Sequence, residues 1–246
     1  MPRYQINIEY VGTKFIGWQI QKKGKSVQGT IQKKLSKILK EKIILIGSGR
    51  TDSGVHAIEQ SAHFDCTKKI KNHKIFLKSC NFFLNKNLIS ILKIKTQKST
   101  FHARHNAKMR SYLYIIHNRE SPPSLNKERG WHIKRNLNLN LMKRGAKKLI
   151  GTFNYSTFRA SSCGAKSPIR TIKNFKITKY KNTIKIRVHS KSFLQHQVRS
   201  MVGCLKYLGE EKWSIKYFEK VFNSKKRSFC APPAPACGLF LEKITY

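Results

Sequence analysis

The sequence predicts an α+β fold in which two ferredoxin-like halves, each with the order βαββαβ, form a central, mainly antiparallel sheet flanked by helices, with an active-site cleft between the halves. Segments with apolar residues at every second position alternate with segments whose apolar residues recur every three to four positions. The resulting order of strands and helices occurs twice, without repetition of the sequence itself. The length of 246 residues suits one large domain or two small ones, and we expect the halves at 1–105 and 106–246.

The first half opens with an alternating segment, in which Ile6 and Ile8 share one face of a strand over 4–10. Ser26 can then cap a helix whose apolar stripe includes Ile31 and Leu35. The further elements expected in this half are strands over 42–47, 58–66 and 88–97 and a helix over 73–85.

The second half opens with a strand over 108–117, in which Tyr112 and Tyr114 lie on one face and Leu113 on the other. A turn at Lys181-Asn182 is expected to join two of its later strands. The further elements expected in this half are helices over 138–150, 193–208 and 213–223 and strands over 171–180, 184–190 and 238–246.

The composition indicates a polyanionic partner, because 51 Lys and Arg residues against 11 Asp and Glu residues give a net charge of +40. Compositional drift toward lysine is the alternative explanation. Arginine suits bidentate phosphate recognition, and ferredoxin-like units in a basic chain favour single-stranded or looped RNA as the polyanion. Six arginines stand in motif-like stretches: Arg50, Arg104, Arg110, Arg159, Arg170 and Arg199.

The six cysteines contain no Cys-x-x-Cys pair, so reduced thiols are expected and neither a disulfide framework nor a metal site is predicted. His63 and Cys66 are three residues apart on an expected strand, so they face opposite sides and do not form a zinc site. The first residues lack a signal-like apolar region, and no apolar run reaches the length of a membrane helix. We therefore expect a soluble, cytoplasmic protein that does not contact a membrane.

The stretch Gly49–Ala57 places Asp52 in a glycine-containing loop between two expected strands. An aspartate in such a loop can simply shape a turn. The stretch is not a Walker loop, because Val55-His56 follows Gly54 where Lys and Ser or Thr are required, and it is not a dinucleotide fingerprint, because Asp52 stands at the third glycine. We interpret Asp52 as the reactive residue and expect His56 to order the loop through hydrogen bonds.

Together with four other blocks, this stretch resembles the tRNA pseudouridine synthase A family over nearly the whole chain. Val11 stands where that family usually has aspartate, Gln197 where it has methionine, and Ser200 where it has asparagine, which leaves the efficiency of this chain open. The four other blocks are Tyr10–Gln19, Phe101–Arg104 with Arg110–Tyr114, Phe193–Gly203, and Ala234–Leu241.

The resemblance implies a homodimeric isomerase that needs no cofactor and converts uridines at positions 38, 39 and 40 of the tRNA anticodon stem-loop into pseudouridine. It implies that Asp52 is the nucleophile, with attack on ribose C1′ or on uracil C6 left open. Arg199 would pair with the carboxylate, because an ionised group in a water-poor site needs a cation. Tyr112 would stack on the target base and help to remove the C5 proton.

The resemblance also implies base flipping, with Arg50 filling the vacated space or holding a phosphate of the flipped nucleotide. Two further stretches would bind RNA, although an ordinary solvated charge run is the alternative for both. They are Phe101, His102, Ala103, Arg104 and His105, and Lys166, Ser167, Pro168, Ile169 and Arg170. The alternative function is a non-catalytic tRNA-binding protein or RNA chaperone. A deaminase is excluded, because the zinc signature of that class is absent.

Overall fold

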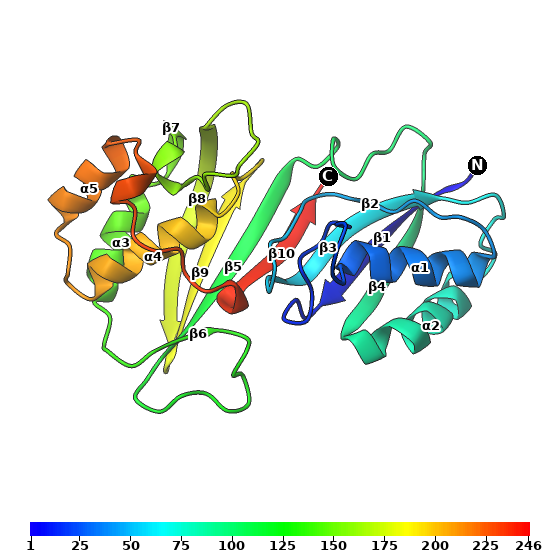
Figure 1. Cartoon of the computed structure of the whole chain (residues 1–246), viewed down its shortest axis with the longest axis horizontal. Helices are drawn as coiled ribbons and strands as arrows, with labels where there is room; N and C mark the ends of the chain where they lie inside the picture. Colours follow the sequence, from blue (N-terminus) through cyan, green and yellow to red (C-terminus); the bar gives the residue numbers. More distant parts are fainter. The chain divides into compact units, whose positions relative to one another are not determined.

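The computed structural model describes residues 1–246 and contains two compact units (Figure 1). Unit 1 comprises Met1–Lys108 and Phe240–Tyr246, and unit 2 comprises Met109–Leu239. The expected division placed the last strand with the second half, whereas the contacts place it with unit 1, because it pairs there with another strand. The predicted fold class is confirmed as α+β with mainly antiparallel strands flanked by helices.

Unit 1 is built on the strand order β4-β1-β3, with all of these pairs antiparallel. The last strand lies parallel to β3, with Phe240 opposite His56. The short second strand also pairs with β3. The five strands are β1 (Arg3–Tyr10), β2 (Ile46–Gly47), β3 (His56–Asp65), β4 (Ile89–Gln97) and β10 (Leu239–Thr245).

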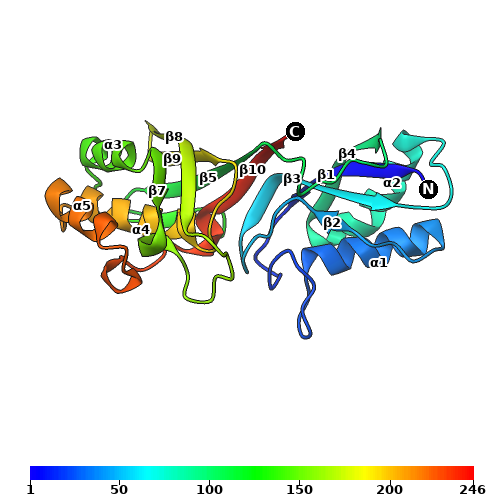
Figure 2. The ribbon, with the colours of Figure 1, turned by 90° about the horizontal axis from the view of Figure 1, so that it is seen from above.

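The helices α1 (Val27–Leu39) and α2 (His73–Leu84) contact each other on one face of this sheet (Figures 1 and 2). Ser26 caps α1, since its side chain accepts a hydrogen bond from the Gly29 N–H. The apolar stripe expected for α1 is confirmed, because Ile31 and Leu35 are buried. A 3₁₀ turn (Asn85–Asn87) then leads into β4.

The expected strand over 42–47 is wrong for its first four residues, because only Ile46–Gly47 pairs with a neighbouring strand. Ile43 and Leu45 are nevertheless buried. Their N–H groups donate to side chains of α1 instead, at 3.0 Å to Ser36 Oγ and 3.1 Å to Gln32 Oε1. Buried backbone groups need partners, and the helix supplies them here in place of a strand.

Unit 2 has the strand order β5-β9-β8-β7, all antiparallel, with β6 parallel to β5. Its helices α3, α4 and α5 contact one another, and α3 packs on β8. The strands are β5 (Met109–Asn118), β6 (Trp131–Ile133), β7 (Gly151–Asn154), β8 (Ile169–Tyr180) and β9 (Thr183–Ser190). The helices are α3 (Leu139–Lys148), α4 (Gln197–Gly209) and α5 (Ile215–Asn223). Sequence patterns missed β6 and β7, because segments of three and four residues are too short to show a period.

The helix α4 begins at Gln197 and not at residue 193, which corrects the expected range of 193–208. His196 has a left-handed backbone, with φ of 62°, that the helix cannot include. The Gln197 side chain accepts a hydrogen bond from the Leu194 N–H at 2.8 Å and so closes a turn in front of the helix. None of the helices combines the length and the apolar character that a membrane span requires.

Candidate functional site

Asp52 begins a tight turn in the loop that precedes β3. The Val55 N–H donates to the Asp52 carbonyl at 3.2 Å, and Gly54, the third residue of the turn, has φ of 75°. A positive φ at this position is typical of a type II turn and favours glycine. The Asp52 side chain is half-buried, and that of its neighbour Arg50 is exposed.

The opening loop 11–18 holds the residues on both sides of Asp52 in place. The Trp18 N–H donates to the Thr51 carbonyl at 3.0 Å, and the Ser53 hydroxyl donates to the Phe15 carbonyl at 3.2 Å. A Cβ atom at Gly17, whose φ is 120°, would lie 2.7 Å from the Thr51 carbonyl oxygen, so this close approach requires glycine. Asp52 is therefore carried by a loop with little freedom to move.

His56 joins the opening loop to β3, as expected for a residue that orders the Asp52 loop. Its Nδ1 accepts a hydrogen bond from the Gly12 N–H at 3.0 Å, and its ring stacks on Phe240 with centroids 4.7 Å apart. Since Nδ1 is an acceptor, the proton of the neutral ring lies on Nε2.

Two further supports of the loop were not predicted from the sequence. The Tyr10 hydroxyl lies 2.8 Å from the Thr51 hydroxyl, and Gln60 Nε2 donates to the Gly49 carbonyl at 2.8 Å. Gln60 is fully buried, so its side-chain amide needs a partner, and the Gly49 carbonyl is that partner.

Unit 2 contains the two other residues expected to be catalytic. Tyr112 lies in β5, is only 9% exposed, and packs edge-on against Phe193 with ring centroids 5.2 Å apart. Arg199 lies in the first turn of α4 and is half-buried. Its Nε donates to the Ala234 carbonyl at 2.7 Å, and the Ala234 N–H donates back to the Arg199 carbonyl at 3.0 Å. The Nε bond orients the guanidinium, whose Nη groups form the fork that suits a carboxylate, and the backbone bond ties the start of α4 to Ala234.

The expected RNA-binding stretch 101–105 is a loop of unit 1 that is anchored at Ala103. The Ala103 N–H donates to His63 Nδ1 at 3.2 Å, and its carbonyl accepts from the Tyr246 hydroxyl at 2.9 Å. Ala103 is fully buried, whereas Arg104 and His105 are exposed. The structure thus makes Ala103 an anchor and presents Arg104 and His105 to solvent.

The flanking residues of this loop are also tied down. The Arg3 Nη1 donates to the Phe101 carbonyl at 2.7 Å, and the Phe101 ring packs on Tyr246 with centroids 5.0 Å apart. The His102 ring lies 4.9 Å from that of His63 and 4.2 Å from that of His105. Burial, together with the positive charges of Arg3 and His102, lowers the pKa of His63 to about 4, so its ring is neutral near pH 7.

The second expected RNA-binding stretch, 166–170, is a surface loop of unit 2 that runs into β8. The Ile169 N–H donates to Ser167 Oγ at 3.1 Å, and Arg170 Nη1 donates to the Ser167 carbonyl at 2.9 Å. The Pro168 carbonyl accepts from the Tyr155 N–H at 3.1 Å. Lys166 is exposed at the end of the loop.

The structure therefore divides the predicted site residues between the units. Unit 1 holds Arg50, Asp52 and the stretch 101–105, and unit 2 holds Tyr112, Arg199 and the stretch 166–170. No three His, Cys, Asp or Glu side chains are grouped in a way that could hold a metal ion.

A family model described as tRNA pseudouridine synthase matches residues 6–106 and 146–246, which together form most of the chain and include Asp52 and Arg199. This chain belongs to the tRNA pseudouridine synthase family. The family is one of isomerases, as the sequence predicted. The family model matches two separate stretches of the chain, which agrees with the expectation of two halves.

Relatives named tRNA pseudouridine synthase A match the full length of the chain. The protein of Pelagibacter ubique (strain HTCC1062) is 65% identical over 246 residues and covers 100% of both chains. The protein of Paramagnetospirillum magneticum (strain AMB-1) is 41% identical over 100% of this chain and 96% of its own length. The protein of Brucella ovis is 37% identical over 100% of this chain and 98% of its own length.

Proposed function

We propose that this synthase converts uridines at positions 38, 39 and 40 of the tRNA anticodon stem-loop into pseudouridine with Asp52 as the nucleophile. The observation that carries the proposal is the fixed position of Asp52, whose neighbours Thr51 and Ser53 are both bonded to the opening loop. A nucleophile in a tight turn is presented to substrate without the entropy cost of ordering its loop on binding.

The reaction breaks the N1–C1′ bond of uridine and forms a C5–C1′ bond, while the C5 proton leaves and N1 gains a proton, so no electrons enter or leave. The Asp52 carboxylate attacks either ribose C1′ or uracil C6 and leaves again when the new bond has formed. Since the reaction balances without an oxidant or a carrier group, the side chains of the protein are sufficient for it.

Tyr112 and Arg199 are the proposed partners of Asp52 in this reaction. Tyr112 has a fixed ring suited to stacking on uracil, and its hydroxyl assists removal of the C5 proton directly or through water. Arg199, held through its Nε, supplies the positive charge that keeps the carboxylate ionised.

The RNA is bound by exposed basic groups of both units. A uridine in a stacked stem is out of reach of the carboxylate and must be flipped out, which costs roughly a few kcal/mol. The exposed Arg50 fills the space that the base leaves or holds a phosphate of the flipped nucleotide. Arg104, His105 and Lys166 offer stacking planes and charges to the surrounding RNA. We further propose that the protein acts as a homodimer in the cytoplasm.

The direct test is release of tritium from unmodified tRNA labelled at uracil C5, with the unaltered protein and with Asp52→Asn and Asp52→Ala. We expect release by the unaltered protein alone, while both variants still bind tRNA. Release by either variant would remove Asp52 from its role. Tight tRNA binding without release by any of the three proteins would instead indicate a non-catalytic tRNA-binding protein or RNA chaperone.

A further inference from the structure

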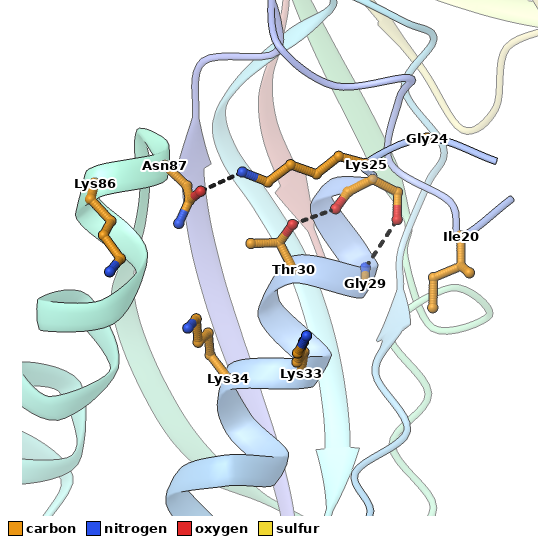
Figure 3. A pocket seen from close by; sticks show the side chains of 10 residues that line it. Ile20, Gly24, Lys25, Gly29, Thr30, Lys33, Lys34, Lys86 and Asn87 are labelled. Atoms are coloured by element: carbon orange, nitrogen blue, oxygen red, sulfur yellow. Dashed lines mark hydrogen bonds between the residues drawn. The ribbon is translucent and has the colours of Figure 1, made fainter.

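Unit 1 contains a pocket of 460 Å³ between the start of α1 and the 3₁₀ turn Asn85–Asn87, and this pocket includes none of the residues assigned above to catalysis or RNA binding. Figure 3 shows Lys33 and Lys34 on α1 across the space from Lys86 and Asn87. Lys25 closes one side of the pocket, where its Nζ bonds to Asn87 Oδ1.

The charge of this pocket is entirely positive, since four lysines and no acidic residue line it. Another pocket of the protein, at Asn138 in unit 2, is lined by both Glu210 and Glu211. The purely basic lining of the unit 1 pocket is thus not shared by this second pocket. Several ammonium groups around one space attract an anion far more strongly than the same groups spread over a convex surface.

The lysines, and not the start of the helix, provide the attraction. The first N–H groups of α1 already have partners, because those of Val27 and Gln28 donate to the carbonyls of Gly17 and Trp18 at 3.1 Å and 2.9 Å. The next N–H donates to the capping side chain Ser26. An anion in the pocket would therefore be held by lysine ammonium groups, which act as point charges without demanding a fixed geometry.

The lining also indicates which part of a nucleic acid would bind. No aromatic ring lines the pocket, so it offers no stacking platform for a base. Lysine alone suits backbone phosphates, which attract cations regardless of sequence. The chemistry therefore fits the sugar-phosphate backbone of RNA and not an unpaired base.

The pocket is connected to the catalytic loop through one chain segment. The Ile16 N–H donates to the Lys25 carbonyl at 3.0 Å, so the two ends of the stretch 16–25 are held together. Its first residues contact the Asp52 loop through the bond between Trp18 and Thr51, and its last residues line the pocket. RNA anchored at Lys25 is thereby attached to the same segment that supports the nucleophile.

We propose that this lysine pocket is a further RNA-binding site, which holds backbone phosphates of the tRNA substrate away from the target uridine. The proposal rests on the proposed function for the identity of the RNA. It predicts that the pocket contributes to tRNA affinity and to its salt dependence, since each neutralised phosphate releases counterions.

The test compares two triple variants that remove the same charge from unit 1. The pocket variant is Lys33→Gln, Lys34→Gln and Lys86→Gln, and the control variant is Lys69→Gln, Lys71→Gln and Lys74→Gln, which are exposed lysines outside the pocket. Glutamine keeps most of the aliphatic stem and a good helix propensity. Thermal melting of both variants checks that the fold is retained.

The dissociation constant for unmodified tRNA is measured over a range of salt concentrations, with Asp52→Asn present in every protein to prevent turnover. We expect the pocket variant to bind about tenfold more weakly near physiological salt, and the slope of log K against log salt to fall by about 1 or more. The control variant should stay within about twofold of the parent, as expected for lysines that contact no phosphate. Equal losses in both variants would overturn the proposal, because the pocket would then act only through net charge.

Steady-state kinetics with Asp52 intact separate this inference from the proposed function. The pocket variant should raise KM for tRNA and not lower kcat, because it removes binding that is equal in ground state and transition state. If the unaltered protein formed no pseudouridine, the proposed function would fail, while the binding comparison would still decide the role of the pocket. A fall in kcat with unaltered binding would place these lysines elsewhere than in RNA anchoring.

Discussion

The hydroxyl group of Tyr10, the last residue of β1, lies 2.8 Å from the hydroxyl group of Thr51, the residue before Asp52. Both side chains are buried, so the hydrogen bond joins the sheet to the Asp52 loop without competition from water. It is thus a direct mechanical support for the position of the proposed nucleophile.

We expect Tyr10→Phe to lower kcat for pseudouridine formation several-fold and the stability by about 1 kcal/mol, because it leaves the Thr51 hydroxyl without this partner. The matched control is Tyr4→Phe, at the other end of β1. The Tyr4 hydroxyl accepts a hydrogen bond from the Ile70 N–H at 2.8 Å, and Tyr4 is also fully buried.

Chemical denaturation and steady-state kinetics of the two variants separate stability from positioning. Both should lose similar stability, and only Tyr10→Phe should lose kcat. If the two variants had the same kcat, the bond to Thr51 would be structural only.

Arg199 provides a second test, because lysine can replace its charge but not its geometry. Arg199→Lys removes the Nε bond to the Ala234 carbonyl and the planar fork. Charge-assisted hydrogen bonds are worth about 1.5–3 kcal/mol, so we expect kcat to fall by about ten- to a hundredfold with a small change in tRNA affinity.

The control for this variant is Arg227→Lys. Arg227 Nη1 donates to Ser200 Oγ at 2.9 Å, so it is a partly buried arginine that contacts the residue beside Arg199. It should retain nearly full kcat. An equal fall in kcat in the two variants would show that the activity depends on the packing of α4 and not on the Arg199 guanidinium.

The proposed homodimer is tested by sedimentation of the purified protein with and without tRNA. We expect a sedimentation coefficient for twice the chain mass of 28.5 kDa at micromolar concentration. A species of single-chain mass that forms pseudouridine at full rate would contradict the homodimer.

The sequence predicted helices and strands correctly where buried apolar residues recur at a regular spacing. The prediction was wrong where side chains, and not a neighbouring strand, accept the backbone hydrogen bonds. The period of Ile31 and Leu35 predicted α1, and both are buried. The segment 42–45 has a strand-like composition, but Gln32 and Ser36 satisfy its backbone, which no local pattern reveals. A left-handed His196 likewise moved the start of α4, although residues 193–196 look compatible with a helix.

The same limit applies to the candidate site. The glycines around Asp52 were enough to predict a loop there. The hydrogen bond between Tyr10 and Thr51 could not be predicted in this way, because it joins residues 41 positions apart. The anchoring of Ala103 by Tyr246 spans 143 positions and places an expected RNA contact in the core. Such long-range hydrogen bonds depend on which distant segments the fold brings together, and no local sequence pattern shows this.

A further support to be tested is His63, which holds the loop 101–105, proposed to bind RNA, only while its Nδ1 is unprotonated. Burial and the nearby positive charges of Arg3 and His102 lower its pKa from 6.5 in the unfolded chain to about 4 in the folded protein. Between these values the unfolded chain binds the extra proton, so stability falls as the pH is lowered from about 7 toward 4, by about 3 kcal/mol at most.

Denaturation by urea across this pH range, with the unaltered protein and His63→Gln, measures the effect. Glutamine does not titrate and its Oε1 can still accept from the Ala103 N–H, so the variant should show a flatter pH profile. Other groups also titrate, among them Asp65, whose pKa is lowered chiefly by its hydrogen bond to Arg3. Contributions that do not involve His63 are present in both proteins and cancel, so the difference reports the titration of His63 together with its charge interaction with Asp65. Parallel profiles for the two proteins would show that His63 keeps an ordinary pKa and that its proton does not oppose the anchoring of Ala103.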